Sequence, residues 1–129
     1  MTPTPEAPLL MPRRLAILLL HEAQIATGPF VGLVSAPNTD GAEPDGWLPM
    51  GGMTDIETLP AQWQAADKRV WALYIHRPAM PAMPAIEDFS AQPALLRLTA
   101  SLAIKGVLQL RAWQCLQGRV VECELHIHD

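Results

Sequence analysis

The chain has 129 residues, half of them hydrophobic, which is enough to bury one core and too few for two. Its formal charge of −4 offers no basic stripe, which argues against nucleic acid as a partner. The apolar run at 15–20 is too short to cross a bilayer, so no membrane association is expected. Two cysteines, Cys115 and Cys123, fit a reducing, cytoplasmic compartment, although a disulfide between them across a hairpin stays open.

The first third of the chain predicts a tail, a helix and a strand. Residues 1–8 are rich in proline and threonine and predict a flexible tail, so the domain is expected to span 9–129. Apolar residues recur at helical spacing over 13–27, and Gly28-Pro29 is typical of a helix end. The next segment, 30–36, predicts a strand in which Gly32 marks a close backbone approach, and a surface turn follows.

The middle of the chain predicts the strand around which the fold is built. A short strand is expected at 47–50, and a helix within 54–68 with Trp63 and Ala66 facing inward. The apolar and aromatic run that begins at Val70 predicts a buried, central strand. It leads into a loop that three prolines between 78 and 84 hold extended.

The last third alternates apolar and polar residues and predicts an antiparallel meander. Strands are expected at 95–102, 107–115 and 119–127, with Gln117-Gly118 in the turn between the last two. Glu122, Glu124, His126 and His128 then share one face of the final strand. The fold class predicted is α/β (α+β), with a mixed central sheet flanked by helices.

The residues after the central strand resemble those of the MPN/JAB domain family, the JAMM metalloproteases, in its compact prokaryotic form. Ile75-His76-Arg77-Pro78 stands where the family has His-Ser-His-Pro, and Asp88 follows a Pro/Ala-rich loop at the family's spacing. The opening helix, the strand with Gly32 and the closing hairpin extend the resemblance over most of the chain from about Pro8. The resemblance implies a cytidine-deaminase-like fold.

In active relatives, two histidines and an aspartate hold Zn²⁺, a glutamate serves as general base and a serine holds the oxyanion. The corresponding residues here are Ile75 and Arg77 for the histidines, Ala85 for the serine and Pro29 for the glutamate, with Asp88 and Pro78 retained. Isoleucine has no lone pair to donate, and arginine stays protonated. We therefore expect no catalytic residue, no metal and no other cofactor.

Weaker alternatives for these residues remain open. His76 is a candidate metal ligand with Asp88, but strand alternation turns it away from Ile75 and Arg77. His126 and His128, two residues apart, could chelate a metal, although such a pattern is more often the solvent-exposed face of an edge strand. Arg77 could instead pair with Asp88 in the place of the metal, or both could be solvent-exposed.

The function predicted is that of a catalytically inactive MPN/JAB-like domain acting as a binding or scaffold module. The resemblance implies a protein partner, either a ubiquitin-like or sulfur-carrier tail or a catalytic MPN partner, and a homodimer. The residues expected to line the binding groove are Tyr74, Arg77, Pro78 and Asp88. The alternatives are a divergent zinc-dependent JAMM-type peptidase and a small-molecule binder in which Arg77 clamps a carboxylate.

Overall fold

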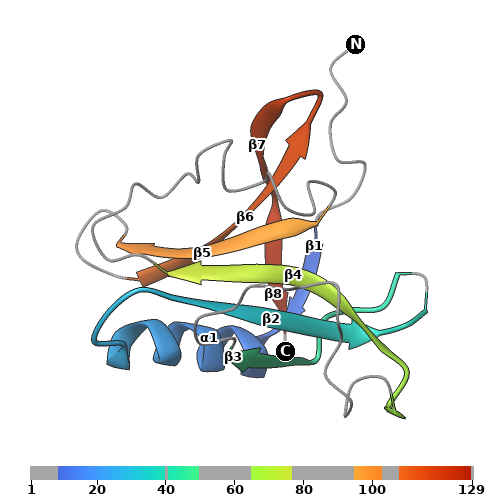
Figure 1. Ribbon diagram of the computed structural model, residues 1–129, viewed down its shortest axis with the longest axis horizontal. Coiled ribbons are helices and arrows are strands. Elements are labelled where there is room, and N and C mark those ends of the chain that lie inside the picture. Colours follow the sequence, from blue (N-terminus) through green and yellow to red (C-terminus); the bar gives the residue numbers. More distant parts are fainter. Residues whose placement is uncertain (1–8, 40, 50–64, 77–94, 103–107, 129) are drawn as a thin grey trace.

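The chain folds into two sheets and one helix within the residues that the structure describes. This computed structural model describes residues 9–39, 41–49, 65–76, 95–102 and 108–128 (Figure 1). The elements are β1 (Leu9–Pro12), α1 (Arg13–Ile25), β2 (Phe30–Pro37), β3 (Gly46–Pro49), β4 (Lys68–His76), β5 (Leu96–Leu102), β6 (Leu108–Leu116), β7 (Arg119–Cys123) and β8 (Leu125–His128).

The larger sheet has the strand order β3-β2-β4-β5-β6-β7, and β4 lies inside it between β2 and β5. The pair β4–β5 is parallel and the other neighbours are antiparallel, so the predicted mixed sheet is confirmed. The predicted meander is confirmed by the succession of β5, β6 and β7. Residues 71–76 of β4 are all buried, which explains why this strand reads as a nearly continuous apolar run.

The end of the chain departs from the prediction. The expected strand at 119–127 is divided at Glu124, and β8 leaves the larger sheet to pair in parallel with β1 (Figure 1). The backbone N–H of Leu9 donates to the carbonyl of Glu124 at 2.9 Å where the two strands meet. Apolar and polar residues alternate without a break from Val121 to His128. The sequence pattern therefore does not indicate that the chain changes its partner strand at Glu124.

Helix α1 covers one face of the larger sheet with a narrow apolar stripe. Its buried residues are Leu15, Ala16, Leu19 and Ala23. The helix ends at Ile25, two residues before the predicted end, and the apolar residues Leu18 and Ile25 are exposed. No described helix has the length and apolar character needed to cross a bilayer.

The predicted helix at 54–68 lies largely outside the described residues, and Trp63 is among those not described. Where the chain is described again, Ala65 is helical and Ala66 lies in an exposed turn. Lys68 already belongs to β4. The prediction that Ala66 faces inward and that the helix reaches Lys68 is therefore wrong, because the chain needs a turn before it enters the sheet.

The two cysteines are free thiols, with Cys123 buried and Cys115 half-buried. The hairpin register pairs Cys115 with Val120 and Cys123 with Ala112, so the two thiols do not lie opposite each other. Burial, and secondarily the charge of Glu122, raises the pKa of the Cys123 thiol, which disfavours its thiolate form.

The close approach predicted at Gly32 is confirmed. The ring of Trp47, from β3, lies directly over Gly32 of β2, where any side chain would collide with it. The same ring packs edge-on against Tyr74, with centroids 5.8 Å apart. Gly32 therefore makes room for the aromatic contact that joins β3 to the central strand.

Replacing Gly32 with alanine should destabilise the protein by about 1–3 kcal/mol, because the added methyl group forces Trp47 away from Tyr74. Urea denaturation followed by tryptophan fluorescence measures the loss. The control is Gly28→Ala, where a Cβ meets nothing within 4 Å. Equal stability of both variants would show that Trp47 does not depend on Gly32.

Candidate functional site

The sheet brings the start of β2 and the end of β4 together. Phe30 pairs with His76 and Val31 pairs with Ile75. Pro29, the residue directly before β2, therefore lies at the same end of the sheet as Ile75 and His76. The structure thus places two stretches of the family pattern side by side that are more than forty residues apart in the sequence.

Ile75 is buried between two neighbouring strands. Its register partners are Val31 on β2 and Thr99 on β5, and 5% of its surface is exposed. Because side chains alternate along a strand, Ile75 and His76 point to opposite faces of the sheet. The place that the resemblance assigns to a zinc ligand is thus occupied by a buried aliphatic side chain.

His76 belongs to an aromatic cluster on one face of the sheet, which also contains Phe30, Trp47 and Tyr74. Its ring lies 5.1 Å from that of Phe30, and 8% of the residue is exposed. Its Nδ1 is buried and has no hydrogen-bond partner among the described residues. Burial lowers the pKa of His76 below its usual value of 6.5, so the imidazole is neutral at pH 7.

Tyr74, predicted to line the binding groove, is instead a core residue. It is fully buried, and its hydroxyl donates to the carbonyl of Leu19 in α1 at 2.6 Å. Burial, and secondarily the charge of Glu22, raises the pKa of Tyr74. The prediction is wrong for this residue because the pleat turns Tyr74 toward the helix.

The other predicted site residues, Arg77, Pro78, Ala85 and Asp88, lie outside the described residues. The groove and the Arg77–Asp88 pair therefore stay predictions.

His126 and His128 take part in two separate pairs. His126 contacts Glu124 on its own strand at 3.0 Å, and His128 contacts Glu43 from the loop before β3. Nowhere in the described ranges do three or more His, Cys, Asp or Glu side chains gather closely enough to hold a metal ion.

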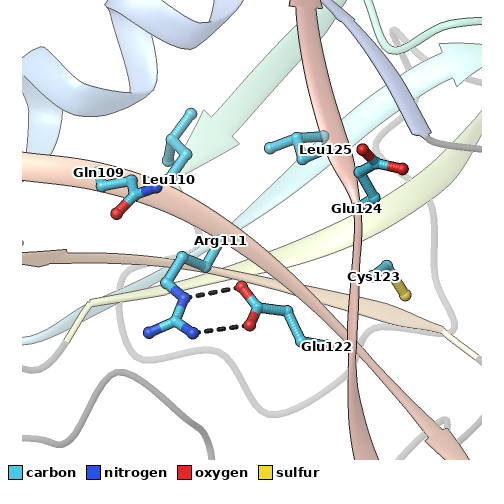
Figure 2. A pocket seen from close by; sticks show the side chains of 7 residues that line it. All are labelled: Gln109, Leu110, Arg111, Glu122, Cys123, Glu124 and Leu125. Atoms are coloured by element: carbon cyan, nitrogen blue, oxygen red, sulfur yellow. Dashed lines mark hydrogen bonds and ion pairs between the residues drawn. The ribbon is translucent and has the colours of Figure 1, made fainter.

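A pocket that the sequence did not predict lies between β6 and the passage from β7 to β8. Its volume is about 390 Å³, and it is lined by Gln109, Leu110, Arg111, Glu122, Cys123, Glu124 and Leu125. Figure 2 shows Gln109 and Leu110 on one side and Glu124 and Leu125 on the other. The turn at Gln117-Gly118 determines which residues of the hairpin lie opposite each other. Nothing in the sequence indicated that the chain would leave the larger sheet after Cys123.

Two residues that line this pocket, Arg111 and Glu122, form an ion pair. The guanidinium of Arg111 donates two hydrogen bonds to the carboxylate of Glu122, at 2.7 and 2.6 Å (Figure 2). This bond lowers the pKa of Glu122 and raises that of Arg111. The guanidinium also lies 4.8 Å from the ring centre of Trp113, whose indole N–H donates to Thr99 at 3.0 Å. Glu122 and the ring of Trp113 therefore hold the Arg111 side chain in place, and the carboxylate of Glu122 neutralises its charge.

Comparison with known proteins defines the fold. No protein-family model matches the sequence, and no curated protein matches it. Among solved structures, a protein from Desulfitobacterium hafniense is similar with a TM-score of 0.68, at 16% identity over 94% of each chain. A protein from Salinibacter ruber has a TM-score of 0.60, at 17% identity over 94% of this chain and 92% of that one.

A JAB1/MPN domain protein from Archaeoglobus fulgidus is also similar. Its TM-score is 0.56, at 16% identity over 93% of this chain and 99% of that one. At such low identity the likeness concerns the fold alone. The chain has the fold of a JAB1/MPN domain, as the resemblance implied.

The buried imidazole of His76 predicts a stability that depends on pH. In the unfolded chain His76 titrates near 6.5, whereas in the folded chain its pKa is lower, so the unfolded state binds more protons below that value. The free energy of unfolding should therefore decrease as the pH falls from about 7 to about 5. His76→Phe should make this decrease shallower, as measured by urea denaturation across the range.

The matched control for this prediction is His21→Gln, because His21 is exposed on α1. This variant should keep the slope of the native chain. An unchanged slope in His76→Phe would mean that His76 is not the group responsible.

Proposed function

We propose that this chain is a catalytically inactive MPN/JAB-like domain that acts by binding a protein partner. The observation that carries the proposal is the junction of β2 and β4. There Pro29 and Ile75 lie at the same end of the sheet, and the resemblance assigns to them the places of the general base and of a zinc ligand. Neither side chain can accept a proton or donate a lone pair to a metal.

The sequence extends the same argument to Arg77 and Ala85. An arginine in the second histidine position stays protonated and repels a divalent cation. An alanine in the serine position provides no donor for an oxyanion. Asp88 alone would remain of the ligand set, and one carboxylate does not hold zinc at the affinity of a protein site.

The binding mode proposed is the addition of an extended tail beside the central strand. Arg77, Pro78 and Asp88 would line the groove, with Arg77 paired to Asp88 in the place of the metal. The partner proposed is a ubiquitin-like or sulfur-carrier tail, or a catalytic MPN domain, and a second copy of the chain is a further candidate. The free thiols of Cys115 and Cys123 support a cytoplasmic location.

The purified protein should contain well under one zinc per chain, even after growth in zinc-supplemented medium, and a chelator should leave its melting temperature unchanged. The reason is the loss of lone-pair donors at Ile75 and Arg77. Metal analysis by mass spectrometry measures the content. The double variant Ile75→His/Arg77→His, which restores two ligands beside Asp88, should gain zinc. Stoichiometric, chelator-sensitive zinc in the native chain would instead support the divergent peptidase.

Binding of a tail is tested by titrating the chain with a ubiquitin-like protein and with the same protein lacking its last six residues. The full-length protein should bind, and the truncated one should bind at least about tenfold more weakly, because the tail supplies the added strand. Calorimetry measures both affinities. Equal binding, or none, would contradict this choice of partner.

A further inference from the structure

Strand β6 is paired on both sides over only part of its length. On one side β5 pairs with residues 108–113 of β6. On the other side β7 pairs only with residues 112–116. Among the described residues, the first four residues of β6 therefore have a neighbouring strand on one side and none on the other.

The pairing of β6 with β7 ends there because the chain turns away after Cys123. Glu124 begins the connection to β1, and β8 continues in the smaller sheet. The departing chain diverges from β6 and leaves the pocket of about 390 Å³ between them (Figure 2). This volume falls within the range typical of ligand sites.

The backbone of Leu110 faces this opening. Gln117 and Gly118 both have positive φ values, of 50° and 75°, and form a two-residue turn that makes Leu116 and Arg119 a hydrogen-bonded pair. Hydrogen-bonded pairs then recur at every second residue of β6, so Gln114 and Ala112 also direct their N–H and C=O groups toward β7. By the same alternation, Leu110 directs its N–H and C=O away from β5. Among the described residues, no strand pairs with Leu110 on that side and no further backbone bond reaches it.

The side chains around the opening indicate which kind of segment fits. Leu125 is half-buried and supplies the accessible apolar wall, whereas Leu110 is 6% exposed and packs in the core. Arg111 and Glu122 neutralise each other through their two hydrogen bonds. The carboxylate of Glu124 is well exposed, with 68% of its side chain accessible, and its partner is the imidazole of His126. The charge left for a ligand is therefore negative, in keeping with the net charge of −4.

We infer that the open edge of β6 at residues 108–111 binds an extended peptide of a partner protein as an added strand. The backbone of the peptide pairs with Leu110, a small apolar side chain packs against Leu125, and a lysine or arginine reaches Glu124. This surface is separate from the groove proposed beside β4, so either can fail without the other.

The experiment uses three capped hexapeptides and the ¹⁵N-labelled full chain. The first alternates valine with lysine, the second replaces lysine with glutamate, and the third is the lysine peptide methylated on alternate backbone nitrogens. The lysine peptide should shift the amide resonances of Leu110, Glu124 and Leu125 and slow hydrogen exchange at Leu110. The other two should bind at least about tenfold more weakly.

Variants of the chain test the contribution of the Glu124 carboxylate. Glu124→Gln should weaken binding of the lysine peptide, whereas Glu43→Gln, which lies outside the pocket lining, should leave it unchanged. Equal binding of the methylated peptide would show a side-chain pocket that does not use the backbone, and would overturn the inference. Absence of shifts at Leu110, or shifts confined to β3 at the opposite edge, would also overturn it.

Discussion

The pairing of β2 with β4 is the constraint on which the rest of the structure depends. It buries residues 71–76 of β4 in the sheet and sets Phe30 opposite His76. It also sets Gly32 opposite Tyr74, beneath the ring of Trp47. Because Tyr74 then reaches the carbonyl of Leu19, the same pairing fixes where the helix docks. One register thus positions the helix, the aromatic cluster and the candidate site.

Along β4, the alternation of side chains separates two environments. Tyr74 and His76 face the aromatic cluster, and Ile75 faces the other side between Val31 and Thr99. Burying an isoleucine contributes about 1.5–3 kcal/mol, so an aliphatic residue at this place stabilises the sheet without a bound ion. Ile75, at the place that the resemblance assigns to a zinc ligand, is thus part of the core.

The departure of the chain from the larger sheet at Glu124 has two consequences for the structure. It sends β8 to pair with β1, which ties the start of the domain to its end. Among the described residues, it also leaves residues 108–111 of β6 without a second neighbouring strand and opens the pocket beside Leu110. An unpaired edge is usually a liability for a protein, and here it is short and bordered by the charged residues Arg111, Glu122 and Glu124.

The sequence by itself determined the elements that local chemistry specifies: the helix that ends before Gly28-Pro29, the close approach at Gly32, the buried β4 and the hairpin turn at Gln117-Gly118. It also indicated that Ile75 and His76 lie on opposite faces, because the strand period is two. Only the tertiary structure decided that Tyr74 packs under α1, that Leu18 and Ile25 stay exposed, and that β8 leaves the sheet after Cys123. These outcomes depend on which element packs against which, and periodicity along one strand or helix is the same whichever partner it meets.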